Sequence, residues 1–183
     1  MKESTIFSIG HGNKSVERFI SELRSFNIDY LVDVRSKPYS KRNADFNRDM
    51  LEHHLSAAGI RYVYMGDVLG GLPSDSSCYT RGHIDYGKMA GTSSFIVGLQ
   101  RIVTANNKGI RLCLMCSESD PSMCHRSKLI GQELLKHEIM TRHITAVGKA
   151  RTQYDVIYSL TKGKGTVDLF GEETTLMSRK EYA

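Results

Sequence analysis

The feature that most constrains the fold is a regular alternation between short apolar runs and amphipathic segments. The apolar runs cover residues 6–9, 30–34, 60–65, 110–116 and 140–145. Helical periodicity covers residues 16–26, part of 43–59, 93–105 and a stretch that begins at residue 124. Alternation at this spacing predicts an α/β fold, in which a single domain is built on a doubly wound, mainly parallel sheet of about five strands.

The length of the chain fits one domain. Its 183 residues match the usual domain size. We expect the domain in residues 1–150, followed over 151–183 by a C-terminal helix and a polar tail that is partly disordered or docks as an appendage. Residues 66–91 are rich in Gly and Ser and predict a long loop, which in a domain of this kind is usually functional or mobile.

Composition excludes several classes of protein. Hydrophobic residues make up 40% of the chain and both charge signs are mixed, which excludes disorder throughout. No apolar run approaches a membrane span and the first residues lack a signal-peptide core, so we expect a cytoplasmic protein without membrane contact. The net charge of +5 favours an anionic partner, either a small molecule or nucleic acid. Four cysteines in a domain of this size do not indicate a disulfide framework.

Chemically versatile side chains gather where the predicted strands end. In a parallel sheet the carboxyl ends of the strands share one edge, and ligands bind there. The residues that follow the first, second and fourth strands in this way are His11 and Asn13, then Asp33, Arg35 and Lys37, and then Cys116 and Glu118. We therefore expect them in one cleft, together with the residues that close the last loop, Cys124, His125 and Arg126.

The spacing of Cys113 and Cys116 resembles a metal or redox pair, but strand geometry favours another interpretation. Side chains alternate faces along a strand, so residues three apart point to opposite faces. Cys113 is thus expected in the core, and Cys116 at the end of its strand is free to face the cleft.

The segment from Cys116 to Arg126 is the sharpest motif. One hypothesis makes Cys116 a nucleophile, with Glu118 or His125 carrying protons. A second makes the segment an anion site, formed by Arg126 and the N-terminus of the following helix.

A third hypothesis is a metal site held by Cys116, Cys124 and His125, with His11 as a further ligand. The spacing matches no standard zinc pattern. The plain structural alternative is that Cys124 and His125 only cap and pack the helix.

A run of cations follows the second strand. Arg35, Lys37, Lys41 and Arg42 lie within eight residues, and Tyr39 lies among them. Such a cluster at the ligand-binding edge suits phosphates, with the tyrosine stacking on a base. An exposed charged loop is the alternative.

These motifs together resemble the DUF488 family of small bacterial and archaeal proteins. The similar segments are FSIGHGN, LVDVRSKPYS, IRYVYMGDVLGG and LMCSESDPSMCHR, within roughly residues 5–145. Gly12 stands where the family usually has Ser. The resemblance implies an α/β fold whose polar residues share one cleft, and it supplies no reaction. The matching positions here are His11, Asn13, Asp33, Arg35, Cys116, Glu118, Cys124, His125 and Arg126.

We therefore predict an enzyme, a hydrolase or transferase, with a basic cleft that acts on a phosphorylated, nucleotide or nucleic-acid-like ligand. Cys116 would be the reactive thiol and Glu118 the general acid/base, while His11 and His125 orient groups or relay protons. The expected ligand- or anion-binding residues are Asn13, Asp33, Arg35, Lys37 and Arg126. The sequence requires no cofactor. The alternative is a non-catalytic module that binds nucleic acid or a Cys/His-held metal.

Overall fold

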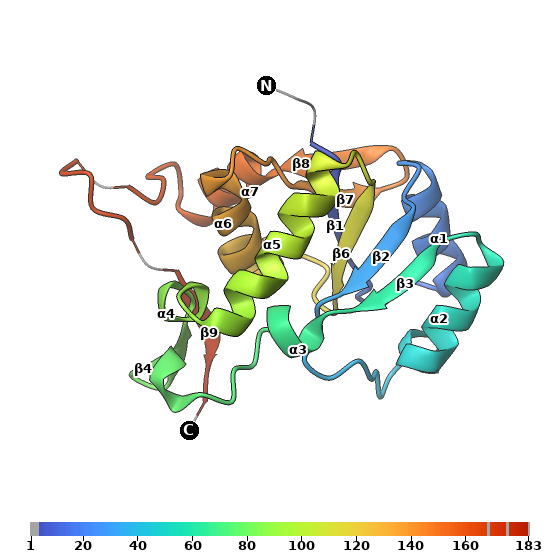
Figure 1. Cartoon of the computed structure of the whole chain (residues 1–183), viewed down its shortest axis with the longest axis horizontal. Coiled ribbons are helices and arrows are strands. Elements are labelled where there is room, and N and C mark those ends of the chain that lie inside the picture. Colours follow the sequence, from blue (N-terminus) through green and yellow to red (C-terminus); the bar gives the residue numbers. More distant parts are fainter. Residues whose placement is uncertain (1–3, 168, 175, 183) are drawn as a thin grey trace.

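A six-stranded sheet forms the centre of the computed structural model, which describes residues 4–167, 169–174 and 176–182 (Figure 1). In spatial order its strands are β3 (Arg61–Tyr64), β2 (Tyr30–Asp33), β6 (Leu112–Cys116), β1 (Ile6–Gly10), β7 (Arg142–Ala146) and β8 (Lys149–Thr152). The first five strands in this order are parallel, and β8 pairs antiparallel with β7. The predicted α/β class and mainly parallel sheet are confirmed.

The sheet has one strand more than expected. β8 is a four-residue segment, KART, with no apolar run. It pairs through a hairpin at the edge of the sheet, where a strand needs no buried face. Hydrophobic periodicity therefore carries no signal for it.

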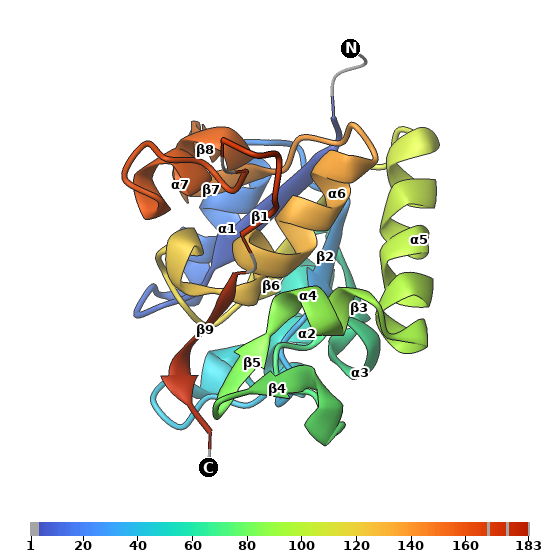
Figure 2. The same cartoon turned by 90° about the vertical axis from the view of Figure 1, so that its left-hand side faces the viewer.

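Helices cover both faces of the sheet (Figures 1 and 2). One face packs against α1 (Val16–Arg24) and α2 (Arg48–Ala57). The other packs against α5 (Ser93–Asn107) and a helical segment made of η4 (Arg126–Gly131) and α6 (Gln132–Lys136). The remaining helices are η1 (Ala44–Phe46), α3 (Gly66–Leu69), η2 (Ser76–Cys78), α4 (Tyr86–Ala90), η3 (Pro121–Met123) and α7 (Gln153–Leu160).

Local chemistry explains where α1 begins. The Ser15 side chain accepts a hydrogen bond from the Arg18 amide at 3.3 Å, which caps the N-terminus of the helix. Val16, Phe19 and Leu23 are buried on one side, facing the sheet. Capping thus sets the start of the helix, and the apolar spacing sets which side packs.

Residues 66–91 are not the long loop that their composition indicated. They contain α3, η2, α4 and two short strands, β4 (Tyr79–Thr80) and β5 (His83–Asp85). β5 also pairs with β9 (Met177–Glu181), so the three strands form a second, small sheet. The described part of the tail is therefore docked on the domain by β9, and residues 168, 175 and 183 of that tail lie outside the description.

None of the helices in the described residues is both long and apolar enough to cross a lipid bilayer.

Candidate active site

A cavity of about 260 Å³ lies at the carboxyl ends of β2 and β6. Its walls come mainly from the turn after β2, the loop after β6 and the C-terminal segment that contains β9, and the segment after α3 and the start of α4 also contribute. Figure 2 shows β9 beside β5, reaching from the far end of the chain to this edge of the molecule. Of the predicted site residues, those that border it are Arg35, Lys37, Cys116, Glu118, Cys124 and His125.

Cys116 and Cys124 meet in this cavity. Their Sγ atoms are in direct contact, and the structure pairs them as a disulfide. Their Cα atoms are 7.6 Å apart. Cys113 is fully buried on the opposite face, beside α1 and α2, as strand alternation predicts.

Glu118 adds a carboxylate to the sulfur pair. Its Oε2 lies 3.1 Å from Cys116 Sγ, and the side chain is exposed. One ligand atom from each of Cys116, Glu118 and Cys124 lies within 4.8 Å of the others, a set that fits a divalent metal. The metal hypothesis thus gains Glu118, which spacing did not suggest.

His125 lies beside Cys124. Its Nε2 is 3.2 Å from the Val34 carbonyl oxygen, and its Nδ1 is 3.5 Å from Cys124 Sγ. A carbonyl oxygen only accepts, so Nε2 carries the proton in that bond and Nδ1 presents a lone pair to the thiol. Burial is the main cause that lowers the His125 pKa, which keeps the ring neutral.

Arg126 lies behind the cysteine rather than in the cavity. It is fully buried, and Nη1 donates to Cys116 Sγ at 2.7 Å and to the Glu118 carbonyl at 2.6 Å. Nη2 donates to the Ser119 carbonyl at 3.1 Å. Burial lowers the pKa of Arg126 to about 10, which still leaves it a cation at neutral pH. Its hydrogen bonds hold the loop after β6, so its place differs from the ligand-binding position expected for it.

The expected anion site at the start of the following helix has a different form. The segment after His125 begins as the π-helix η4, and the Ser127 and Lys128 amides donate to the Cys124 carbonyl at 3.2 and 3.1 Å. Two of the backbone amides that were expected to bind an anion therefore donate instead to a carbonyl oxygen of the chain.

A buried relay that sequence reasoning missed supports Arg126. Arg126 Nε donates to Ser8 Oγ at 3.2 Å, Ser8 Oγ lies 2.6 Å from His143 Nδ1, and His143 Nε2 lies 2.7 Å from Gln153 Oε1. The Gln153 oxygen accepts, so His143 Nε2 carries a proton and Nδ1 accepts from Ser8. Burial lowers the pKa of His143 to about 3, so this neutral arrangement persists at neutral pH.

Arg35 is held in place by Asp33. Its Nε and Nη2 donate to the two Asp33 carboxylate oxygens at 2.9 and 2.7 Å, and both residues are buried. The Tyr62 hydroxyl donates to the same carboxylate at 2.7 Å. Asp33 is thus a positioning residue for Arg35, while the exposed Lys37 borders the cavity from the same turn.

His11 and Asn13 lie outside the cavity wall formed by the described residues. The His11 ring stacks on Phe46 with centroids 4.5 Å apart, and its Nδ1 lies 3.0 Å from the Gly12 carbonyl oxygen. Burial is the main cause that lowers its pKa. Asn13 is exposed and borders a neighbouring hollow.

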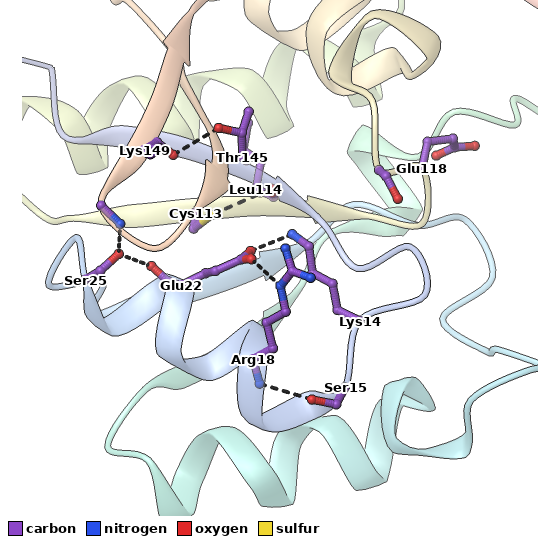
Figure 3. A network of polar contacts seen from close by, with 12 residues as sticks. Lys14, Ser15, Arg18, Glu22, Ser25, Cys113, Leu114, Glu118, Thr145 and Lys149 are labelled. Atoms are coloured by element: carbon purple, nitrogen blue, oxygen red, sulfur yellow. Dashed lines mark hydrogen bonds and ion pairs between the residues drawn. The ribbon is translucent and has the colours of Figure 1, made fainter.

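A buried ion-pair cluster fixes the turn that carries these two residues. Lys14 and Arg18 both reach the Glu22 carboxylate, which is fully buried (Figure 3). In the same view the cluster lies apart from Glu118, so the turn after β1 lies beside the candidate site and not within it.

Part of the cavity comes from residues that the sequence did not indicate. Arg179, Lys180 and Tyr182 border it from the C-terminal segment, and Tyr86 borders it from α4. The pairing of β5 with β9 joins segments nearly a hundred residues apart, and no local pattern reveals it. The two adjacent basic residues in the segment SRKEY were the one sequence signal for this part of the cavity wall.

Comparison with known protein families gives one match. A family model described as "Domain of unknown function DUF488" matches residues 15–132. The chain belongs to the DUF488 family. The DUF488 match covers the Arg35 turn and the whole segment from Cys116 to Arg126, whereas His11 and β9 fall outside it. No curated protein and no solved structure shows significant similarity to the chain.

Proposed function

We propose that this DUF488 protein is an enzyme that uses Cys116 as a nucleophile on a small anionic substrate. The observation that carries the proposal is the fully buried Arg126 guanidinium, whose Nη1 lies 2.7 Å from Cys116 Sγ. A cation that donates to sulfur favours the thiolate, which is the reactive form.

The groups around the sulfur allow a balanced reaction. With the cysteine pair reduced, the Cys116 thiol gives its proton to the Glu118 carboxylate. The sulfur then bonds to an electrophilic carbon or phosphorus of the substrate, and the leaving group departs with the proton from Glu118. Water or a second substrate cleaves the thio-intermediate, so the enzyme is a hydrolase or a transferase. Free thiols suit a reducing compartment such as the cytoplasm.

The charge on the cavity wall supports an anionic substrate. Arg35, Lys37, Arg179 and Lys180 border the cavity against the single carboxylate of Glu118. A small volume favours a small molecule over a nucleic-acid strand.

A specific observation favours a second function, metal binding. The ligand atoms of Cys116, Glu118 and Cys124 lie within 4.8 Å of one another. Two thiolates and a carboxylate, with His125 beside them, suit Zn²⁺. This arrangement would make the site a metal-binding module rather than a thiol enzyme.

Peptide-resolved labelling with iodoacetamide at neutral pH separates the two functions. The protein is first reduced with dithiothreitol, desalted and labelled with and without a chelator. Cys116 and Cys113 are both buried, but only Cys116 borders the cavity. We expect fast labelling of Cys116 that ignores the chelator, with Cys113, on the opposite face of the sheet, as the slow internal control. Burial raises the pKa of the Cys113 thiol, which also disfavours its reaction. Labelling of Cys116 and Cys124 only after chelation would support the metal site, and inert cysteines in both samples would refute the thiol enzyme.

A further inference from the structure

The cavity has a basic wall that thiol chemistry alone does not need. Arg35 and Lys37 border it from the turn after β2, and Arg179 and Lys180 border it from β9. Because these cations come from opposite ends of the chain, the fold itself brings them together around one small space.

Arg35 is the fixed point of this wall. Asp33 holds two of its three guanidinium nitrogens, while Nη1 is buried and has no hydrogen-bond partner among the described residues. A buried charged donor without an acceptor costs free energy, which a ligand oxygen at this position would recover. The residue is only 4% exposed, so its side chain is already ordered before a ligand arrives.

The strand β9 is held in place by hydrogen bonds to its backbone and to the Ser178 side chain. The Ser178 hydroxyl oxygen accepts from the Ile84 amide at 2.9 Å and donates to the Lys180 carbonyl at 2.8 Å, and Lys128 Nζ donates to the Met177 carbonyl at 3.4 Å. The side chains of Arg179 and Lys180 remain exposed. Both residues border the cavity, and no ion pair between the described residues involves them.

We propose that this wall is a phosphate subsite, in which Arg35 binds a terminal phosphate of a small molecule and Lys37, Arg179 and Lys180 complete the neutralisation of its charge. A phosphate ester is a dianion with three free oxygens, and a guanidinium matches it better than an ammonium does. Asp33 already neutralises Arg35, and the three other cations on the wall, Lys37, Arg179 and Lys180, exceed the single carboxylate of Glu118. The inference rests on the proposed function only for its claim that the rest of the substrate reaches Cys116.

Calorimetric titration of the reduced full-length chain with inorganic phosphate and pyrophosphate tests the subsite. We compare the wild type with Arg35→Gln and with the double variant Arg179→Gln/Lys180→Gln, and the matched control is Arg101→Gln, an exposed cation on α5. We expect each site variant to lose affinity by about tenfold, because it removes charged hydrogen-bond donors from the subsite. The control variant should bind as the wild type does.

The β9 double variant keeps the test decisive even if Arg35→Gln fails to fold, because Arg179 and Lys180 are exposed. Equal affinity in the wild type and the double variant would overturn the subsite, and so would a wild type that binds neither anion. An oligonucleotide that binds and is not displaced by pyrophosphate would also overturn it, in favour of a nucleic-acid site. If phosphate does not bind while wild-type Cys116 still labels quickly, the subsite is rejected and the thiol enzyme stands. If phosphate binds while Cys116 does not label, only the thiol enzyme is rejected.

Discussion

At the scale of single residues, Cys116 lies between two opposite influences. The exposed Glu118 carboxylate, 3.1 Å from the sulfur, disfavours a second negative charge. The buried Arg126 guanidinium favours it. Burial strengthens the influence of Arg126, and solvent screens Glu118, so the cation should dominate.

Replacing Glu118 separates proton transfer from thiol activation. In Glu118→Gln the anion beside the sulfur is gone, so the Cys116 pKa should fall and alkylation at neutral pH should speed up by a few-fold, the modest size reflecting solvent screening. Turnover of any substrate should fall, because the proton carrier is lost. Labelling that is quenched at several times and read by mass spectrometry measures the alkylation rate of Cys116, with Glu17→Gln on α1 as the control. Slower alkylation in Glu118→Gln would show that the carboxylate activates the thiol instead.

The residue types at the strand ends predicted part of the cavity wall. Cys116, Glu118, Arg35 and Lys37 were expected at one edge because parallel strands end together, and the cavity borders all four. The role of Arg126 could not be read from sequence, because whether a side chain points into a cavity or behind a loop depends on packing between β1, β6 and η4.

At the scale of elements, close packing of β1 against the loop after β6 holds the site together. A Cβ atom on Gly10 would lie 1.8 Å from the Glu118 carbonyl oxygen and 3.0 Å from Arg126 Nη1. Only glycine allows this approach, so the positions of β1 and of the loop after β6 depend on one another.

Gly10→Ala should displace the loop. We expect a loss of roughly 1–3 kcal/mol in unfolding free energy from overpacking, and slower Cys116 labelling as Arg126 loses its contact. Gly91→Ala is the matched control, because the φ of Gly91 is −81° and the Lys88 carbonyl oxygen would lie 3.5 Å from the new methyl, an ordinary van der Waals contact. That control should gain about 0.4–1 kcal/mol. Denaturant unfolding and labelling of both variants give the comparison, and equal behaviour of the two would contradict the role of Gly10.

Elements with a buried apolar pattern were predictable, and elements that depend on distant pairing were not. The five parallel strands and the helices α1, α2 and α5 follow from local periodicity. β8 and β9 are short and polar, and each is stabilised by the strand beside it rather than by its own sequence. The basic residues that β9 contributes to the cavity were not predicted, because the strand that carries them was not predicted.

At the scale of the whole molecule, buried neutral histidines tie stability to pH. His11, His125 and His143 are all buried, and burial lowers the pKa of each. The unfolded chain takes up protons on these rings as the pH falls below about 6.5, while the folded chain does not. Stability should therefore be greatest above pH 6.5 and be lost as the solution becomes acidic.

His143→Gln tests this linkage. Because the folded pKa of His143 is about 3, this residue alone should cost about 2 kcal/mol between pH 6.5 and pH 5. Urea unfolding at several pH values should show a shallower acid loss in the variant than in the wild type, whatever its stability at pH 7. Parallel curves would contradict a neutral, buried His143.

The central claim is that Cys116 is a thiolate nucleophile, and the pH dependence of its alkylation rate tests this claim most directly. Peptide mass spectrometry of the reduced wild-type chain gives that rate for each cysteine between pH 5 and 10. We expect Cys116 to react first, with a midpoint clearly below the value of about 8.5 for an ordinary thiol. A midpoint at or above that value, or faster reaction of Cys124, would contradict it.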